Sequence, residues 1–475
     1  MVGILSYGVY IPMWRMDRGE IAKTAGILSG GGSRSVASWD EDSLSMAVEA
    51  GIDCLASMDP KEVDVIHFAT VSSPLKEKQA SSLIASALDL RKNVRTSDVT
   101  DSTRAGTIAI QSAFDSVKSG NAKKVLVIAS DCRPAMAGSE FEQTYGDGAA
   151  ALLIGEGDTI AQIEGFSTLS DAIPGTWRRE ADVFPKRFEA KLDRNFGILK
   201  NVPEAVTDLL KKCNVETKDV FKFALYSPDP RGYLNLAKTL NMDAASQLEN
   251  PLFDTVGLTG TPHCLLLLIS ALEKAKPDQM IVCANYGEGS DALLIKTTQN
   301  VEEIKGKRKG TNFISSFRMI ESYGRFTHFK RTPETGSTGP ADTTSLVKYW
   351  RDEKWGIRLY GMKCNNCGTL QYPISRCCMM CSKKDNYEEV KLARRGKVFS
   401  FTHDYLQGCG GVPGDGINPC TRVIVDLEDG CRMWREMSDN TLQEVKIDMP
   451  VELTFRLIRK TDGFPYYGWR VRPER

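Results

Sequence analysis

One structural unit occurs twice in the first 300 residues, and this duplication limits the choice of fold more than any other feature. In segments 103–131 and 257–287, small residues open a stretch with apolar positions at helical spacing. A lysine-containing turn and an apolar, β-rich run follow in both. The segments at 145–155 and 286–296 then match as YGDGAAALLIG and YGEGSDALLIK. Because glycine lets two backbones approach closely, these repeats predict two similar, tightly packed halves.

Apolar strands also precede both units, at 63–71 and 222–227. Strands that alternate with helices predict an α/β architecture. Two similar halves predict a pseudo-twofold arrangement with a cleft between them. The length of 475 residues further predicts two or three domains.

Several of these segments resemble one enzyme family, the hydroxymethylglutaryl-CoA synthases, chiefly the prokaryotic branch. The resemblance covers roughly residues 1–330 and implies a five-layered thiolase fold with two pseudo-twofold halves, usually a dimer. It also implies a tunnel through which pantetheine reaches a buried nucleophile. The segments that carry it are GILSYGVYIP at 3–12, TRAGT at 103–107, WRRE and FPKR within 177–187, YGEGSDA at 286–292 and YGRFTHFK at 323–330.

The chain departs from this family at its catalytic positions. Such synthases form an acyl-enzyme on a cysteine at a helix N-terminus, where the helix dipole favours the thiolate. The matching residue here is Thr103, whose hydroxyl lacks that acidity. The family's glutamate falls at about Val71, its histidine at Ser227 or Pro228, and its asparagine near Leu258. The resemblance therefore predicts that this is not an ordinary hydroxymethylglutaryl-CoA synthase.

Other polar residues are candidates for the missing roles. A helix start favours an anion or oxyanion, which singles out the residues around the first helix start. An alternative interpretation is that most of these side chains cap helices or line a polar channel. The catalytic candidates are Ser102, Thr103, Tyr226, His263 and Tyr286, and the candidates for binding CoA are Arg178, Lys186 and Arg187.

Two cysteines near these candidates are predicted to be structural. Cys264 follows His263, but side chains at adjacent helix positions point about 100° apart, so the two do not form a nucleophile–base pair. Cys132 follows an apolar strand. Buried, inert thiols are the favoured interpretation of both.

Two CxxC pairs, Cys364 with Cys367 and Cys378 with Cys381, are separated by ten residues. Four thiolates in two such knuckles can surround one metal ion tetrahedrally, and thiolate softness favours zinc or iron. We expect a closed, structural zinc site made of these four cysteines. Cys377 would give a CxxxC spacing and is expected to remain unligated.

An aromatic, amphipathic stretch at 343–356 precedes the cysteines, and short strands follow them. Helix, four-cysteine ribbon and small β-barrel in that order resemble the zinc-ribbon/OB-fold proteins that accompany thiolases. OB folds often bind nucleic acid, but the cations Arg456, Arg459, Lys460, Arg470 and Arg472 would serve a CoA phosphate equally well. The expected boundaries are 1–165 and 166–330 for the thiolase-fold halves, 331–342 for a linker, 343–390 for helix plus zinc ribbon and 391–475 for the OB barrel.

The bulk composition restricts partners and location. With 61 basic and 61 acidic residues the formal net charge is zero, which argues against nucleic acid or an anionic membrane as the main partner. The sequence shows neither a signal peptide nor an apolar run long enough to span a membrane, so a cytoplasmic location is expected.

Three hypotheses of function follow. The first is an enzyme that makes or breaks a carbon–carbon bond on an acyl-CoA by aldol or Claisen-type chemistry, without a cysteine acyl-enzyme. The second is a non-catalytic scaffold that channels CoA thioesters to a true thiolase partner. The third, and least favoured, is nucleic-acid binding through the OB barrel. If the chain is such an enzyme, its expected partners are acyl-CoA and a second copy of the chain.

Overall fold

The computed structural model describes residues 1–330, 345–405, 419–461 and 464–475. The chain forms two compact units. The linker predicted at 331–342 lies outside the described residues. Unit 1 comprises Met1–Ala37, Met46–Ala85 and Leu90–Tyr323, and unit 2 comprises Ser38–Ser45, Ser86–Asp89 and Gly324–Arg475.

Unit 1 contains a nine-stranded sheet in the order β11-β12-β13-β8-β1-β7-β6-β4-β5. In one half β4 and β6 are parallel while β6–β7 and β7–β1 are antiparallel. The other half repeats this pattern. Its strands β11 and β12 are parallel, and the pairs β12–β13 and β13–β8 are antiparallel. The halves join where Gly3 and Ile4 of β1 pair with Gln162 and Ala161 of β8. The strands are β1 (Val2–Tyr10), β4 (Val65–Ala69), β5 (Arg95–Val99), β6 (Lys124–Asp131), β7 (Gly148–Glu156), β8 (Ala161–Ser170), β11 (Val220–Leu225), β12 (Met280–Tyr286) and β13 (Gly289–Thr297).

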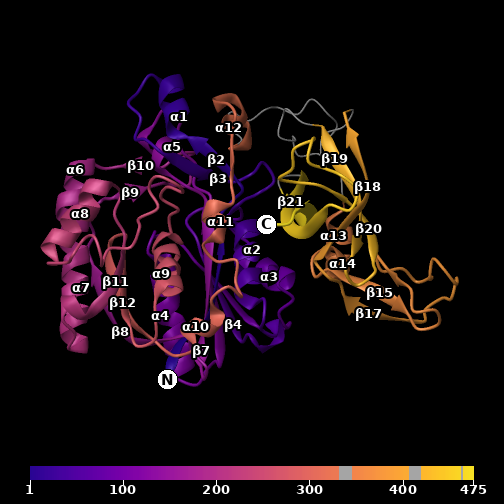
Figure 1. Cartoon of the computed structure of the whole chain (residues 1–475), viewed down its shortest axis with the longest axis horizontal. Helices are drawn as coiled ribbons and strands as arrows, with labels where there is room; N and C mark the ends of the chain where they lie inside the picture. Colours follow the sequence, from indigo (N-terminus) through magenta and orange to yellow (C-terminus); the bar gives the residue numbers. More distant parts are fainter. Residues whose placement is uncertain (331–344, 406–418, 462–463) are drawn as a thin grey trace. The chain divides into compact units, whose positions relative to one another are not determined.

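The helices of unit 1 lie in layers that alternate with these strands (Figure 1). Two central helices start the repeated units, and outer helices cover the strands on either side. The central helix α9 is buried from His263 to Leu272, as a helix apolar on every side must be. This arrangement confirms the predicted thiolase-type fold with two related halves. The helices that lie wholly or mainly in unit 1 include α2 (Ser43–Leu55), α3 (Ala80–Ala87), α4 (Ala105–Lys118), α7 (Leu199–Cys213), α8 (Pro230–Thr239) and α9 (His263–Lys274).

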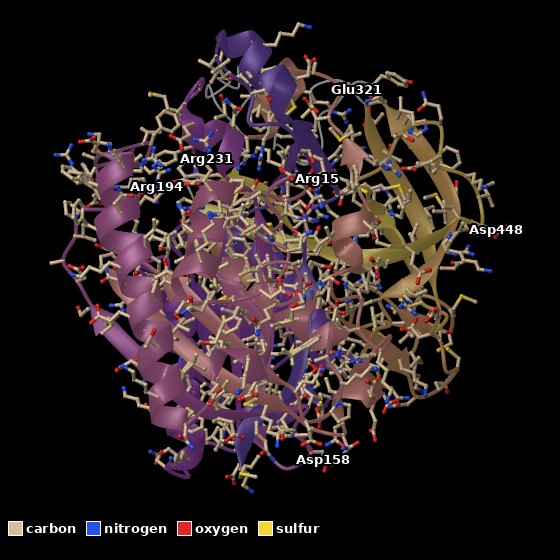
Figure 2. The ribbon with its side chains drawn as sticks, turned by 60° about the vertical axis from the view of Figure 1, so that its left-hand side comes forward. Arg15, Asp158, Arg194, Arg231, Glu321 and Asp448 are labelled. Atoms are coloured by element: carbon tan, nitrogen blue, oxygen red, sulfur yellow. The ribbon has the colours of Figure 1, made fainter. Side chains whose placement is uncertain are left out.

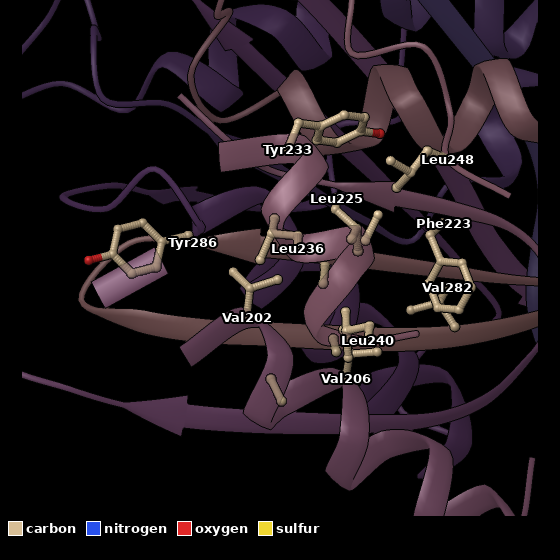
Figure 3. Close-up of a cluster of buried hydrophobic side chains, with 14 of the residues drawn as sticks. Val202, Val206, Phe223, Leu225, Tyr233, Leu236, Leu240, Leu248, Val282 and Tyr286 are labelled. Carbon is tan, nitrogen blue, oxygen red and sulfur yellow. The ribbon is translucent and has the colours of Figure 1, made fainter. Parts of the chain in front are cut away.

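A hydrophobic cluster fixes the outer helices of the second half to its strands (Figure 3). Val202 and Val206 of α7 and Leu236 of α8 are wholly buried against strands β11 and β12. Tyr286, at the end of β12, belongs to the same cluster. Its hydroxyl points to the left in Figure 3, away from the other labelled side chains. The packing of α7 and α8 therefore determines what surrounds this tyrosine.

Unit 2 contains a four-cysteine ribbon followed by a β-barrel. The ribbon strands β15 (Tyr360–Cys364), β16 (Leu370–Gln371) and β17 (Tyr387–Lys391) form a small sheet. The barrel strands run in the order β20-β19-β18-β21-β22, and a bridge between Met437 and Val471 brings its two edges together. The stretch predicted as one helix forms two short ones, α13 (Leu346–Arg351) and α14 (Glu353–Gly356). The barrel strands are β18 (Arg395–Asp404), β19 (Cys420–Leu427), β20 (Arg432–Glu436), β21 (Pro450–Thr461) and β22 (Phe464–Pro473).

Three barrel arginines are buried rather than available to a ligand. Arg456, Arg470 and Arg472 are at most 1% exposed. Arg456 pairs with Asp40 at 3.2 Å and with Glu41 at 2.8 Å, and both carboxylates belong to a segment of unit 2 from near the N-terminus. The expectation that these arginines serve a CoA phosphate is therefore wrong, because protein carboxylates already neutralise them. Among the described helices, none has the length and apolarity needed to span a membrane.

Candidate active site and metal site

The start of α4 is held against the turn between β12 and β13. The Thr103 hydroxyl donates to the Tyr286 carbonyl at 2.8 Å, and the Asn285 amide donates to the Thr103 carbonyl at 3.0 Å. The Ser102 hydroxyl donates to Glu288 at 2.7 Å. A Cβ at Gly287 would lie only 2.7 Å from the Thr103 hydroxyl, so glycine is needed for this approach. Both candidate hydroxyls thus use their protons in contacts that join the halves of unit 1.

Three other candidates gather at the start of α9. Tyr226 follows β11, Tyr286 ends β12, and His263 is the first residue of α9. The Tyr226 ring lies edge-on to His263 at 6.1 Å and nearly parallel to Tyr286 at 6.3 Å, centroid to centroid. We call these three residues the aromatic cluster. The structure therefore brings together three predicted catalytic residues that are 37 and 23 positions apart in the chain.

His263 is a buried imidazole whose two nitrogens have no hydrogen-bond partner among the described residues. It is only 1% exposed. Burial, with a smaller effect of Arg133, lowers its pKa from 6.5 to about 3. The ring is therefore neutral at physiological pH and retains one N–H for a ligand. Unpaired buried polar atoms are costly, so a ligand that paired with them would be favoured.

This lowered pKa predicts a pH dependence of stability that a His263→Phe variant should lack. The unfolded chain binds the extra proton below about pH 6.5, whereas the folded chain does so only near pH 3. Stability is therefore full above pH 6.5 and is lost as the pH falls toward 3. Between pH 7 and 5, native unit 1 should lose about 2 kcal/mol more than the variant. Urea unfolding at both pH values measures this difference, and parallel losses would contradict it.

Tyr286 has a partner that the sequence did not reveal. Its hydroxyl donates to Asp193 at 2.7 Å, and Asp193 is 9% exposed. Burial raises the pKa of Tyr286, and the hydrogen bond to Asp193 raises it further. Burial also raises the pKa of Tyr226. Both phenols therefore stay protonated across the physiological pH range.

A second unpredicted carboxylate, Asp131, organises the loop before α9. It is fully buried and accepts hydrogen bonds from the hydroxyls of Thr70, Ser72 and Thr261 at 2.7–2.9 Å. The Thr261 backbone N–H donates to it as well, at 2.8 Å. Asp131 therefore fixes the loop that leads into α9, and with it the position of His263.

The Cys264 thiol beside the cluster is not activated. Cys264 donates to the Ala284 carbonyl at 3.2 Å, and burial raises its pKa well above 9.0. A low pKa is needed for a thiolate nucleophile, so Cys264 fits the predicted structural role. Cys132 lies beside the loop of Ser72, whose hydroxyl accepts from the Cys132 backbone N–H at 2.8 Å.

The three residues predicted to bind CoA lie on or next to the small hairpin of β9 (Thr176–Trp177) and β10 (Lys186–Arg187). Lys186 pairs with Asp182 at 2.9 Å and Arg187 with Glu140 at 2.5 Å. Arg178 donates to the Val71 carbonyl at 3.3 Å. The hairpin is thus near the loop after β4, while two of its three cations already have carboxylate partners.

The four predicted metal ligands converge in unit 2. The Sγ atoms of Cys364, Cys367, Cys378 and Cys381 all lie within 4.8 Å of one another. Cys377 is exposed and lies outside this group. Gly368, after the first pair, adopts a φ of 74°, which glycine allows without strain. Four thiolates at this spacing suit a tetrahedral zinc ion and leave no open position for a substrate.

Comparisons with known proteins agree with both units. A family model described as 3-oxoacyl-[acyl-carrier-protein] synthase III matches residues 97–172. Models described as the rubredoxin-like zinc ribbon and the C-terminal OB-fold domain of ChsH2 match residues 357–388 and 389–456. The hydroxymethylglutaryl-CoA synthase of Methanosphaera stadtmanae is 30% identical over 341 residues, which cover 70% of this chain and 98% of that protein.

Solved structures show the same fold at lower identity. A structure titled HMG-CoA synthase complexed with CoA has a TM-score of 0.62 at 18% identity and covers 72% of this chain and 92% of that one. PksG, an HMG-CoA synthase from Bacillus subtilis, has a TM-score of 0.62 at 16% identity, and the match covers 92% of this chain and 100% of that one. At these identities the likeness concerns the fold alone.

Proposed function

Because the chain belongs to the hydroxymethylglutaryl-CoA synthase family of the thiolase superfamily, we propose that unit 1 makes or breaks a carbon–carbon bond on an acyl-CoA. The observation that carries this proposal is the aromatic cluster, in which the buried Tyr286 phenol, the partly buried Tyr226 phenol and a neutral imidazole meet at the N-terminus of α9. The 30% identical relative named as a hydroxymethylglutaryl-CoA synthase supports a CoA thioester substrate. A homodimer in the cytoplasm is part of the same proposal.

The proposed chemistry uses no acyl-enzyme. In this proposal Thr103 stands at the position of the family's cysteine, and its hydroxyl proton is already donated to the Tyr286 carbonyl. An alcohol in that state, with no base as its partner, is a poor nucleophile. Addition of a thioester enolate to a carbonyl needs no covalent intermediate, only stabilisation of charge on oxygen.

Each member of the cluster has a proposed role in that addition. The new bond forms between the enolate carbon and the carbonyl carbon, and the carbonyl π electrons move to its oxygen. Tyr226, whose raised pKa keeps it protonated, passes its proton to that oxygen. His263 donates its N–H to the thioester oxygen, where the α9 N-terminus also favours negative charge. Tyr286 takes up the proton from the thioester α-carbon as its own hydroxyl proton leaves along the hydrogen bond that it donates.

Replacing Tyr226 or Tyr286 by phenylalanine tests the proposal. The full chain is incubated with acetyl-CoA and acetoacetyl-CoA, and separately with 3-hydroxyacyl-CoA thioesters, and products are followed by mass spectrometry. Each exchange should lower kcat by about 10²- to 10⁴-fold, the range for loss of a general acid or base. Tyr233→Phe is the matched control, because its buried hydroxyl donates to the Glu249 carbonyl.

Unchanged turnover in both tyrosine variants would refute the catalytic roles. Binding of acyl-CoA by the native chain without any turnover would instead favour the non-catalytic scaffold.

A further inference from the structure

Asp193 lies in an unusual turn of the helix that covers the aromatic cluster. Residues Asp193–Ile198 form a π-helical segment, η2, between α6 (Ala190–Leu192) and α7. Such wide turns inside an α-helix are rare and occur frequently at functional sites. Here the turn places the Asp193 carboxylate 2.7 Å from the Tyr286 hydroxyl.

The same turn leaves room for that hydroxyl. A Cβ on Gly197 would lie 1.9 Å from the Tyr286 oxygen and 3.1 Å from the Asp193 carboxylate. Any side chain at this position would therefore displace the tyrosine or the aspartate. Gly197 and Asp193 together define where the phenol oxygen lies.

An ion pair ties the turn to the loop that follows Tyr226. Arg194, labelled in Figure 2, lies 3.5 Å from Asp229, the N-cap of α8. Asp229 also accepts from the Gly232 backbone N–H at 2.8 Å. Asp193, the first residue of η2, thus contacts Tyr286. The next residue, Arg194, contacts Asp229 in the loop that follows Tyr226.

We propose that Asp193 is the positioning residue for Tyr286 and the final acceptor of its proton; this rests on the proposed function. The hydrogen bond directs the phenol proton toward Asp193 and leaves the lone pairs of the phenol oxygen for the substrate. A proton then moves from the thioester α-carbon to the Tyr286 oxygen as the phenol proton moves to Asp193. The electron pair of the broken C–H bond remains on the substrate as the enolate. Both oxygens end protonated, and no other reactant is required.

Asp193→Asn tests this inference, because asparagine keeps the size of the side chain and removes its charge. We expect kcat to fall about 10²- to 10⁴-fold, as for loss of the group that accepts the proton, while KM changes less than about twofold. Asp243→Asn is the matched control, since Asp243 is an exposed carboxylate that accepts from Ser246 at 2.6 Å in a surface turn. Gly197→Ala should lower kcat as well, by displacing the phenol.

A second measurement does not depend on turnover. In chain labelled with ¹³Cζ-tyrosine, the Tyr286 resonance is identified by its loss in Tyr286→Phe, and Asp193→Asn should shift it whereas Asp243→Asn should not. A shifted resonance with no turnover in the native chain would support the positioning of Tyr286 and refute the proposed function. A resonance that does not respond to Asp193→Asn, or an unchanged kcat in an active enzyme, would overturn the inference.

Discussion

Exchange of Cys378 for serine will abolish stoichiometric zinc binding and unfold the ribbon, whereas exchange of the neighbouring Cys377 will leave both intact. The four converging thiols include Cys378 but not Cys377. The ribbon has little else to hold it together, because its three strands contain only two to five residues each. Structural zinc contributes roughly 10–16 kcal/mol to the folding of small zinc domains, so most of the ribbon's stability depends on it.

Zinc content measured by elemental mass spectrometry should be one ion per chain for the native protein and Cys377→Ser. For Cys378→Ser it should be near zero. Limited proteolysis should then cleave within 357–391 in Cys378→Ser only. The two variants differ by one position and remove the same atom, which makes them a matched pair. Equal zinc content in the two variants would contradict the assignment of ligands.

The cysteine ribbon and the two related halves of unit 1 could be predicted, because the pattern that specifies each lies within a short stretch of sequence. A CxxC pair specifies two ligands within four residues, and a repeated strand–helix–strand pattern specifies its own elements through apolar spacing. The strands expected at 63–71 and 222–227 are found as Val65–Ala69 and Val220–Leu225. Local patterns of this kind do not depend on which distant residues become neighbours.

The surroundings of the candidate site could not be predicted for the opposite reason. Asp193 and Asp131 carry no motif, and each acquires its partners only through the tertiary fold. Asp193 is 93 positions from Tyr286, and Asp131 is 130 positions from Thr261. The tyrosines themselves were identifiable, because Tyr226 directly follows one apolar strand and Tyr286 ends another.

The barrel arginines illustrate the same limit through an incorrect prediction. Their charge in short strands suggested a phosphate site, and the sequence offered no sign that carboxylates near residue 40 would neutralise them. Asp40 is 416 positions from Arg456, yet both are fully buried and 3.2 Å apart. Asp439 is buried against the same guanidinium at 2.5 Å. Removing one partner of such a buried ion pair is strongly destabilising, because it leaves the other charge buried and uncompensated.

Replacing Arg456 by methionine should therefore destabilise unit 2 by roughly 3–5 kcal/mol, because three carboxylates would lose the cation they share in a buried site. Arg432→Met is the matched control. Arg432 also forms a two-point ion pair, with Asp426 at 2.5 and 2.8 Å, but its side chain is 51% exposed, and such pairs contribute only about 0.2–1 kcal/mol.

Hydrogen exchange at β21 and β22 measures the local free energy of opening in both variants, and it does so without requiring the whole chain to unfold in one step. Arg456→Met should lose protection in these strands, and raising the salt concentration should change the loss little because buried charges are poorly screened. Arg432→Met should retain near-native protection. If the two variants lost equal protection, burial would not be what makes Arg456 important, and its carboxylate partners would have to reach solvent in the folded protein.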